Sequence, residues 1–308
     1  MFSQPLLIAS RSARMRRAVT GTPALRRLAD RFVAGESLDQ AVGATTGLVD
    51  RGLTVTIDHL GEDTLDAKDA AATRDAYLAL LARLTDLGLP AQVEVSVKLS
   101  ALGQKLASDA AQVTLENAVA ICEAAQRAGT TVTVDMEDHT TVDATLGTVR
   151  DLREEFPWVG AVLQSCLRRT EADCADLATA GSRVRLVKGA YAEPATVAYA
   201  AKRDVDLAYA RCMRILMNSK AYPMIATHDL RMVDIAERLG EELGREPGSY
   251  EFQMLYGIRT TEQRALAARG HIVRVYLPYG EDWYGYFMRR LAERPANLAF
   301  FARSLFSR

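Results

Sequence analysis

Residues 53–58 read LTVTID, a short run of Leu, Val, Ile and Thr that ends in an aspartate. This composition is typical of a β-strand. Seven later runs have the same character, and segments with a helical pattern separate them. The eight runs are Leu53–Asp58, Val93–Leu99, Val132–Glu137, Val159–Ser165, Val184–Lys188, Met224–His228, Tyr250–Met254 and Ile272–Pro278. Eight alternating strand and helix units predict an α/β protein with a (β/α)8, TIM-like barrel.

The segments around these runs predict how the rest of the chain is used. Amphipathic stretches follow the strands, for example Asp69–Asp86, Ala110–Ala128 and Val205–Asn218. The pattern from Arg11 to about Leu48 is also helical. We therefore predict that residues 1–48 form an N-terminal helical arm of the same domain, and that residues 49–308 form the barrel. The loops at 189–196 and 279–282 are expected to be lids.

Composition narrows the class of protein. The chain has 308 residues, 25% of them charged, and a formal net charge of −1, which gives no general attraction to nucleic acid. The four cysteines form no C-x-x-C pair, so reduced thiols in a cytoplasmic protein are expected. No apolar run approaches the ~18 residues of a membrane span. The start of the chain is apolar and then basic, the reverse of a secretory signal.

The arginines between Arg11 and Arg31 make the N-terminal arm locally basic. One interpretation is a solvated helical arm packed on the barrel. The other is a peripheral contact with the anionic inner face of a membrane. The sequence leaves both open.

The active site of such a barrel lies at the C-terminal ends of its strands. Polar or ionisable side chains occupy those ends. They are Asp58, His59, Lys98, Asp135, Gln164, Arg185, Lys188, Thr227, His228, Gln253 and Tyr276. Structural roles remain as alternatives: Asp135 could form an ion pair with Arg185 or Lys188, and Tyr276 could be a packing residue. His228 could be a hydrogen-bonded core histidine, and Gln164 could bond to a neighbouring loop.

Several common chemistries lack their motifs. The chain has no G-x-G-x-x-G, no G-x-x-x-x-G-K-[ST] and no G-x-S-x-G. Its four histidines are scattered, with no H-x-H or H-E-x-x-H. We therefore expect no catalytic metal.

The segment Glu281–Arg294 predicts a last helix with two different faces. One face carries Tyr286, Arg289, Arg290 and Glu293; the opposite face carries Tyr284, Phe287, Met288 and Leu291. The arginines either face water or, if the helix lies across the barrel mouth, point two guanidinium groups inward. Such a pair, with Lys98 as a third cation, would hold a carboxylate firmly.

The predicted mouth has five cations, Lys98, Arg185, Lys188, Arg289 and Arg290, against few carboxylates. This balance predicts an anionic ligand. One substrate carboxylate does not account for all five cations, so a phosphate-bearing cofactor is expected, with Lys188 and the peptide N–H groups of Gly189 and Ala190 as donors. An ion pair between Lys188 and Glu193 is the alternative.

Six motifs together resemble the proline dehydrogenase family. They are VSVKLSALG (95–103), TVDMED (133–138), RLVKGAY (185–191), ATHD (226–229), EFQML (251–255) and YLPYG…WYGYFMRRLAE (276–293). The resemblance runs from about residue 50 to residue 300, and the length is similar to that of the monofunctional bacterial enzymes.

The resemblance implies an FAD enzyme that oxidises L-proline to Δ1-pyrroline-5-carboxylate by hydride transfer to flavin N5. It implies that electrons pass to a membrane quinone, and that a separate pyrroline-5-carboxylate dehydrogenase takes the product. It implies catalytic roles for Asp135, Arg185 and Tyr276. It implies substrate contacts from Lys98, Tyr286, Arg289 and Arg290, with Tyr276 and Tyr286 as walls of the ring. The implied FAD contacts are Met136, Gln164, Arg185, Lys188, Gly189, Ala190, Thr227, His228 and Glu293.

Three other functions remain as alternatives. A Schiff-base lyase or aldolase on the same barrel would use Lys98 or Lys188 as a desolvated amine. A non-catalytic carboxylate-binding protein would carry no flavin. A trans-4-hydroxy-L-proline dehydrogenase is the closest competitor, but the bulk of Tyr276 beside the ring is expected to crowd a 4-hydroxyl group.

Overall fold

The computed structural model describes residue 19 and residues 21–292. Its strands are β1 (Thr54–His59), β2 (Val93–Val97), β3 (Val132–Val134), β4 (Gly160–Gln164), β5 (Arg183–Val187), β6 (Tyr222–Ala226), β7 (Glu251–Leu255) and β8 (Ile272–Tyr279). Its helices are α3 (Pro23–Ala29), α4 (Leu38–Val49), α5 (Ala67–Asp86), α6 (Ala110–Ala128), α7 (Val142–Glu155), α8 (Thr170–Leu177), α9 (Lys202–Met217), α10 (Leu230–Glu242), α11 (Thr260–Ala268) and α12 (Trp283–Ala292), with 3-10 turns η1 (Pro90–Gln92) and η2 (Leu99–Ala101).

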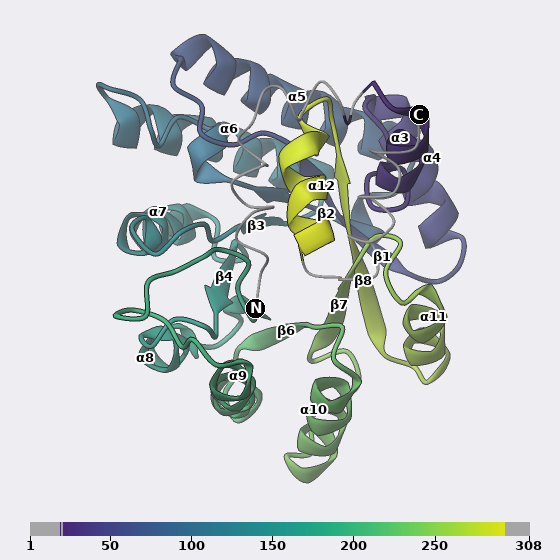
Figure 1. Cartoon of the computed structure of the whole chain (residues 1–308), viewed down its shortest axis with the longest axis vertical. Coiled ribbons are helices and arrows are strands. Elements are labelled where there is room, and N and C mark those ends of the chain that lie inside the picture. The colour runs from purple at the N-terminus through teal and green to yellow at the C-terminus, as the bar shows by residue number, and fades with distance from the viewer. Residues whose placement is uncertain (1–18, 20, 293–308) are drawn as a thin grey trace.

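The eight strands form one closed parallel barrel in chain order, and β8 pairs with β1. Every predicted run overlaps one of these strands, so the barrel prediction is confirmed. The clearest difference is at β3, which ends at Val134, three residues before the predicted end. The chain leaves the barrel wall there, although the Asp135 N–H still donates to the Val97 carbonyl at 2.8 Å. Figure 1 shows the helices arranged around the strands.

Local sequence signals explain where several helices begin and end. Ser37 and Gln40 form a reciprocal capping box at the start of α4. Asp229 caps α10 by accepting the Arg231 N–H at 3.2 Å. Gly129, with φ +78°, ends α6 in the left-handed conformation that glycine adopts easily. The sequence predicted the bounds of α6 and the end of α5 correctly.

The strands alternate between apolar and polar residues, and the two sets face different surroundings. Valine and isoleucine at odd positions of β1 and β2, such as Val55 and Val95, belong to the main hydrophobic core. The intervening polar side chains of these two strands, such as Thr56 and Glu94, are buried, and Thr56 bonds to Glu94 of the neighbouring strand at 2.6 Å. Because successive side chains of a strand point to opposite faces, the interior of this barrel is polar.

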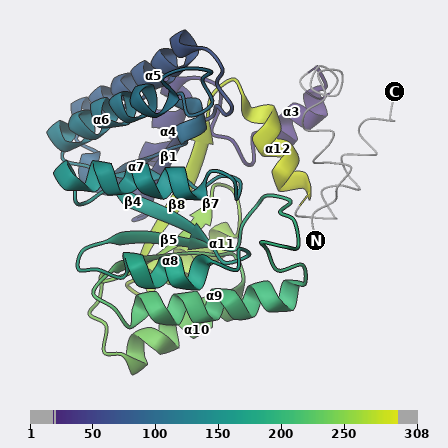
Figure 2. The ribbon, with the colours of Figure 1, turned by 90° about the vertical axis from the view of Figure 1, so that its left-hand side faces the viewer.

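A second, smaller apolar cluster lies above the barrel and joins the two ends of the described chain. It contains Leu28 and Phe32 of the arm and Trp283, Phe287 and Leu291 of α12. Figure 2 shows α3 beside α12 on the same side of the molecule. Burying each large side chain in such a cluster is worth roughly 1.5–3 kcal/mol. This packing holds α12 over the barrel mouth, as predicted (Figure 1).

Hydrogen bonds fasten the arm to the last strand and to α12. The Ala34 N–H donates to the Pro278 carbonyl at 2.9 Å, and the Gly280 N–H donates to the Gly35 carbonyl at 3.0 Å. The Trp283 indole donates to Glu36 at 2.9 Å. Within residues 19 and 21–292, no helix is long and apolar enough to cross a membrane.

Candidate active site

Arg185 is the middle residue of β5 and is only 3% exposed. Its Nε donates to Gln253 at 2.6 Å. Its Nη1 donates both to Ser96 at 2.9 Å and to Asp135 at 2.7 Å, and its Nη2 donates to Glu94 at 3.1 Å. Four side chains, from β2, from β7 and from the residue after β3, therefore fix this guanidinium in one orientation.

Asp135, Tyr276 and Lys98 form a second group beside that arginine. The Tyr276 hydroxyl donates to Asp135 at 2.6 Å, and the Lys98 ammonium lies 3.4 Å from the same hydroxyl. Burial and the charge of Asp135 raise the pKa of Tyr276 well above its ordinary value. Tyr276 is therefore a phenol at neutral pH and acts as a hydrogen-bond donor. Its ring centre lies 5.4 Å from the Arg185 guanidinium carbon.

Lys98 is held by Asp58, the residue at the end of β1. The ammonium donates to both carboxylate oxygens, at 2.8 and 2.7 Å. Burial alone would lower the pKa of Lys98, but the charges of Asp58, Asp135 and Glu62, with the hydrogen bond to Asp58, together outweigh it, and the pKa lies above its ordinary value. Lys98 is therefore an ammonium ion at neutral pH. That is the wrong state for a Schiff-base nucleophile, which must be a free amine.

Arg289 of α12 reaches the loop between β1 and α5. Its two terminal nitrogens form a forked pair with Glu62, with Nη1 to Oε2 at 3.0 Å. The Arg289 side chain is 15% exposed, so this guanidinium does not face open water. Burial and the charge of Glu62 raise the pKa of Tyr191, in the loop after β5. The Arg290 guanidinium lies 5.2 Å from the ring centre of Tyr286, and Tyr286 packs in the smaller apolar cluster.

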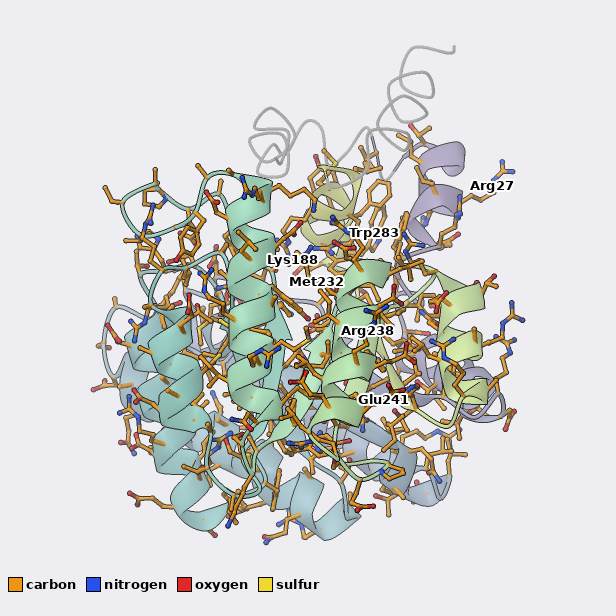
Figure 3. All side chains as sticks on the ribbon, turned by 90° about the horizontal axis from the view of Figure 1, so that it is seen from below. Arg27, Lys188, Met232, Arg238, Glu241 and Trp283 are labelled. Carbon is orange, nitrogen blue, oxygen red and sulfur yellow. The ribbon has the colours of Figure 1, made fainter. Side chains whose placement is uncertain are left out.

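The ion-pair alternative for Lys188 named the wrong partner. Lys188 donates to Asp206 at 2.5 Å and to Asp229 at 3.1 Å, at the N-terminal ends of α9 and α10. Glu193 instead accepts from the backbone N–H of His139 at 3.0 Å and pairs with its ring. In Figure 3, Lys188 and Trp283 lie toward the end of the molecule that carries α12, whereas Arg238 and Glu241 lie further along α10.

The other predicted cofactor residues lie at neighbouring strand ends. The Gln164 amide donates to the Glu137 carbonyl at 2.7 Å. The Thr227 hydroxyl accepts the Asp229 N–H at 3.1 Å, and the His228 Nε2 accepts the Leu255 N–H at 2.9 Å. A neutral His228 that accepts at Nε2 carries its proton on Nδ1. Met136 is buried at the same rim, and Glu293 lies outside the described residues.

The expectation of few carboxylates at the mouth was wrong. Within the described residues, carboxylate partners are seen for at least four of the five predicted cations. These pairs are Lys98 with Asp58, Arg185 with Asp135 and Glu94, Lys188 with Asp206 and Asp229, and Arg289 with Glu62. An excess of positive charge therefore does not by itself require an anionic ligand.

Four residues of this site were not predicted: Glu62, Glu94, Ser96 and Tyr191. Glu94 and Ser96 precede Lys98 by four and two positions, so they point to the same face of β2. This spacing could have predicted that both residues lie in the site. The position of Glu62 depends on the path of a loop and has no comparable signal.

The comparisons with known proteins agree with this geometry. The family model described as Proline dehydrogenase matches residues 41–303. The chain is 41% identical over 272 residues to proline dehydrogenase 2 of Bacillus subtilis, which covers 88% of each chain. It is 43% identical over 280 residues to the proline dehydrogenase of Deinococcus radiodurans, which covers 90% of each. The chain belongs to the proline dehydrogenase family, as its motifs predicted.

Solved structures show the same fold. The proline utilization A (PutA) protein of Bdellovibrio bacteriovorus, inactivated by N-propargylglycine, matches with a TM-score of 0.82 at 26% identity. That match covers 94% of this chain and 36% of the PutA chain, so the chain spans about a third of the length of PutA. A bifunctional PutA protein matches with a TM-score of 0.74 at 23% identity, which supports the fold alone.

Proposed function

We propose that this chain oxidises L-proline to Δ1-pyrroline-5-carboxylate with FAD as the hydride acceptor. The observation that carries the proposal is the group of Lys98, Asp135, Arg185 and Tyr276, which lie in or directly after β2, β3, β5 and β8 and are joined by direct hydrogen bonds. Membership of the proline dehydrogenase family supports the same reaction.

The backbone after β5 fits a cofactor with anionic groups. Gly189 has φ +108°, and a Cβ atom there would overlap the Cys166 sulfur. Within the described part of the chain, the N–H groups of Gly189 and Ala190 donate to no other group. Unpartnered N–H groups in a glycine-containing loop suit phosphate or carbonyl oxygens. We propose that they bind FAD together with Met136, Gln164, Lys188, Thr227 and His228, and with Glu293 as predicted from sequence.

FAD, when bound, supplies the acceptor of the hydride from proline C5. The chain supplies binding, orientation and charge. Arg185 is a fixed cation beside Asp135, so it can stabilise negative charge that develops near it without rearranging. Because its hydrogen bonds are buried, Arg185 keeps its position when the substrate binds. This preserves the geometry for hydride transfer.

The substrate carboxylate is assigned to Arg289, with Lys98 and Arg290 as further cations. Glu62 already forms a forked pair with Arg289, so the incoming carboxylate must either replace Glu62 or bind the guanidinium N–H groups that the pair leaves unused. Tyr276 and Tyr286 are assigned as walls of the pyrrolidine ring. L-Proline is a zwitterion, and its zero net charge matches a mouth in which most cations are already paired.

The proline nitrogen must lose a proton before or during hydride loss, because an ammonium centre opposes departure of hydride. Asp135 already accepts from Tyr276 and Arg185, and Asp58 accepts from Lys98. We therefore assign this proton to solvent at the mouth rather than to either carboxylate.

We further propose that the reduced flavin passes its electrons to a membrane quinone and that a separate pyrroline-5-carboxylate dehydrogenase oxidises the product. The protein would then work in the cytoplasm or at the inner face of the membrane. Residues 1–48 are proposed to belong to the same domain as the barrel of residues 49–308, and the bond from Ala34 to Pro278 supports this assignment.

An anaerobic absorption spectrum of the purified protein, before and after addition of L-proline, tests the reaction. A flavin spectrum that bleaches with L-proline but not with trans-4-hydroxy-L-proline is expected. Bleaching by both would favour the hydroxyproline alternative. A protein that stays colourless after FAD is added back would sink the flavin proposal, and borohydride trapping on Lys98 or Lys188 would then test the Schiff-base alternative.

A further inference from the structure

The loop between β5 and α9 begins at the proposed FAD site. Residues 189–196, the lid loop, are the part of it for which the sequence predicted a lid. The first two residues of the lid loop are Gly189 and Ala190, whose N–H groups are proposed to bind FAD. The contacts that hold the lid loop in place therefore also decide how easily the cofactor enters or leaves.

Backbone hydrogen bonds fix both ends of the lid loop to the segment that follows β4. At the start, the Cys166 N–H donates to the Lys188 carbonyl at 2.9 Å. At the far end, the Arg168 N–H donates to the Val197 carbonyl at 2.9 Å, and the Tyr199 N–H donates to the Cys166 carbonyl at 2.8 Å. These bonds do not depend on side chains. The two ends therefore form a fixed frame, and the residues between them form a flap hinged on it.

A pair of side chains holds the middle of the lid loop to a different part of the barrel. Glu193 Oε1 accepts the backbone N–H of His139, in the loop after β3, at 3.0 Å, and Oε2 pairs with Nδ1 of the same histidine. An ionised carboxylate only accepts hydrogen bonds, so Nδ1 carries the proton. The Glu193 side chain is only 4% exposed. The Arg168 guanidinium also donates to the Ala195 carbonyl, but at 3.3 Å and in an exposed position.

We propose that Glu193 and His139 are positioning residues that latch the lid loop over the bound cofactor and so set the rates at which FAD enters and leaves. This inference rests on the proposed function, in which Gly189 and Ala190 bind FAD. Glu193 follows Gly189 by four residues, so release of the latch frees the segment that carries these N–H groups, while the backbone frame keeps its ends in place. Neither latch residue is assigned a contact with the substrate.

A latch of this kind changes the rates of FAD exchange more than the affinity. The lid loop must open for FAD to enter and also for FAD to leave, and the latch resists opening in both directions. Loss of the latch should therefore raise the association and dissociation rate constants by a similar factor and leave the dissociation constant within about threefold. We expect each rate to rise about three- to thirtyfold, the range for a hydrogen-bonded pair that is partly exposed, as His139 is.

The test uses the FAD-loaded full chain. Exchange of bound FAD for an excess of a deazaflavin analogue, whose absorption spectrum differs, gives the dissociation rate constant. Serial dilution, with the fluorescence of free FAD as the signal, gives the dissociation constant, and the association rate constant follows from the two. His271→Ala is the matched control for His139→Ala, because the His271 ring also pairs with a glutamate, Glu237, at 2.8 Å, but lies just before β8 at the opposite end of the barrel.

A double-mutant cycle separates the latch from a general structural role. Glu193→Ala removes both bonds of the latch and should speed both rates most, whereas His139→Ala keeps its backbone N–H and should have a smaller effect. In the Glu193→Ala background, His139→Ala should have no further effect, and His271→Ala should change neither rate. Glu193→Gln keeps the size of the side chain and replaces Glu193→Ala if that variant does not fold. Hydrogen exchange should become faster at the amides of residues 190–196 but not at the frame residues Cys166 and Arg168.

Two results would overturn the inference while the proposed function stands. If the wild-type protein and Glu193→Ala release FAD at the same rate, the pair is not a latch. If release becomes faster but association does not, so that affinity falls by the same factor, the pair stabilises the bound cofactor and does not control its passage. A wild-type protein that binds no FAD would overturn the proposed function itself, and this inference with it.

Discussion

Replacing Glu94 by glutamine tests whether the buried charges of the barrel interior are as tightly coupled as their distances indicate. Glu94 is 1% exposed and accepts from Arg183 at 2.7 Å, from Arg185 at 3.1 Å and from Thr56 at 2.6 Å. Burial alone would raise the pKa of Glu94, but the charges of Arg274, Arg183 and Arg185 together lower it from an ordinary value of 4.5 to about 2.

The size and sign of the effect follow from that pKa. A fall from 4.5 to about 2 corresponds to roughly 3 kcal/mol of folding free energy at neutral pH, similar to the ~3–5 kcal/mol typical of a broken buried ion pair. Because the pKa is lower in the folded state, this stability is fully present above about pH 5. It is lost progressively as the pH falls from there toward 2. Glu94→Gln should therefore be less stable at pH 7 by about 3 kcal/mol, and its stability should fall less steeply with acid.

Urea unfolding at pH 7 and at a series of lower pH values measures both effects. Glu237→Gln is the control, since Glu237 pairs with Arg269 and His271 but its side chain is 24% exposed. Exposed pairs of this kind contribute about 0–1 kcal/mol. A loss below about 1 kcal/mol for Glu94→Gln, or an acid dependence equal to that of the wild type, would refute the coupling of Glu94 to the three arginines.

Three further predictions concern the carboxylate clamp (Lys98, Arg289 and Arg290), the preference for L-proline over hydroxyproline, and the packing of the N-terminal arm. Arg289→Met should weaken L-proline binding by at least ~2 kcal/mol, because the substrate carboxylate loses its forked partner, and an unchanged apparent affinity would remove Arg289 from the clamp. Tyr276→Ser should raise kcat/KM for trans-4-hydroxy-L-proline relative to L-proline, measured by flavin reduction, and an unchanged ratio would contradict the crowding argument. Gly257→Ala should lower the free energy of unfolding by more than about 1 kcal/mol, because the new Cβ would overlap the Arg31 carbonyl; Gly52→Ala, with a similar φ but open space around it, separates that clash from backbone strain.

The order and type of the barrel elements could be predicted from the sequence because the signal is repeated eight times. Each strand contains apolar residues such as Val, Ile, Leu, Met or Phe, and most end at or before a polar residue at the rim, so an error at one boundary leaves the others intact. Boundaries were less certain where the chain leaves the barrel gradually. β3 shows this, since Asp135 lies beyond the assigned strand yet still bonds to the Val97 carbonyl.

The lysines and arginines of the site were predicted from strand ends and from one face of the last helix. Of their partners, the sequence suggested only Asp135 for Arg185, and the structure contains that pair. The partner of Lys98 is at the end of β1, 40 residues earlier in the chain. The partner of Arg289 is in a loop 227 residues earlier. Such pairs depend on the closure of the barrel and on loop paths, and no local pattern encodes them. The inward-facing Glu94 and Ser96 are different, because the alternation of β2 does place them below Lys98.

The paired interior also explains why the number of cations at the mouth does not by itself predict an anionic ligand. The interior and rim of the barrel carry four acids, Asp58, Glu94, Asp135 and Glu251, and four bases, Lys98, Arg183, Arg185 and Arg274, which are linked by ion pairs. Their formal charges cancel, so the interior attracts no ion through net charge. Each charge nevertheless has a fixed position, because ion pairs and hydrogen bonds within the protein hold it there before any ligand binds. Such an arrangement favours a zwitterion whose opposite charges must be placed at separate points, and it stabilises a change in charge without reorganising. Orientation of the charges, rather than their number, is therefore the property that the polar faces of these strands provide.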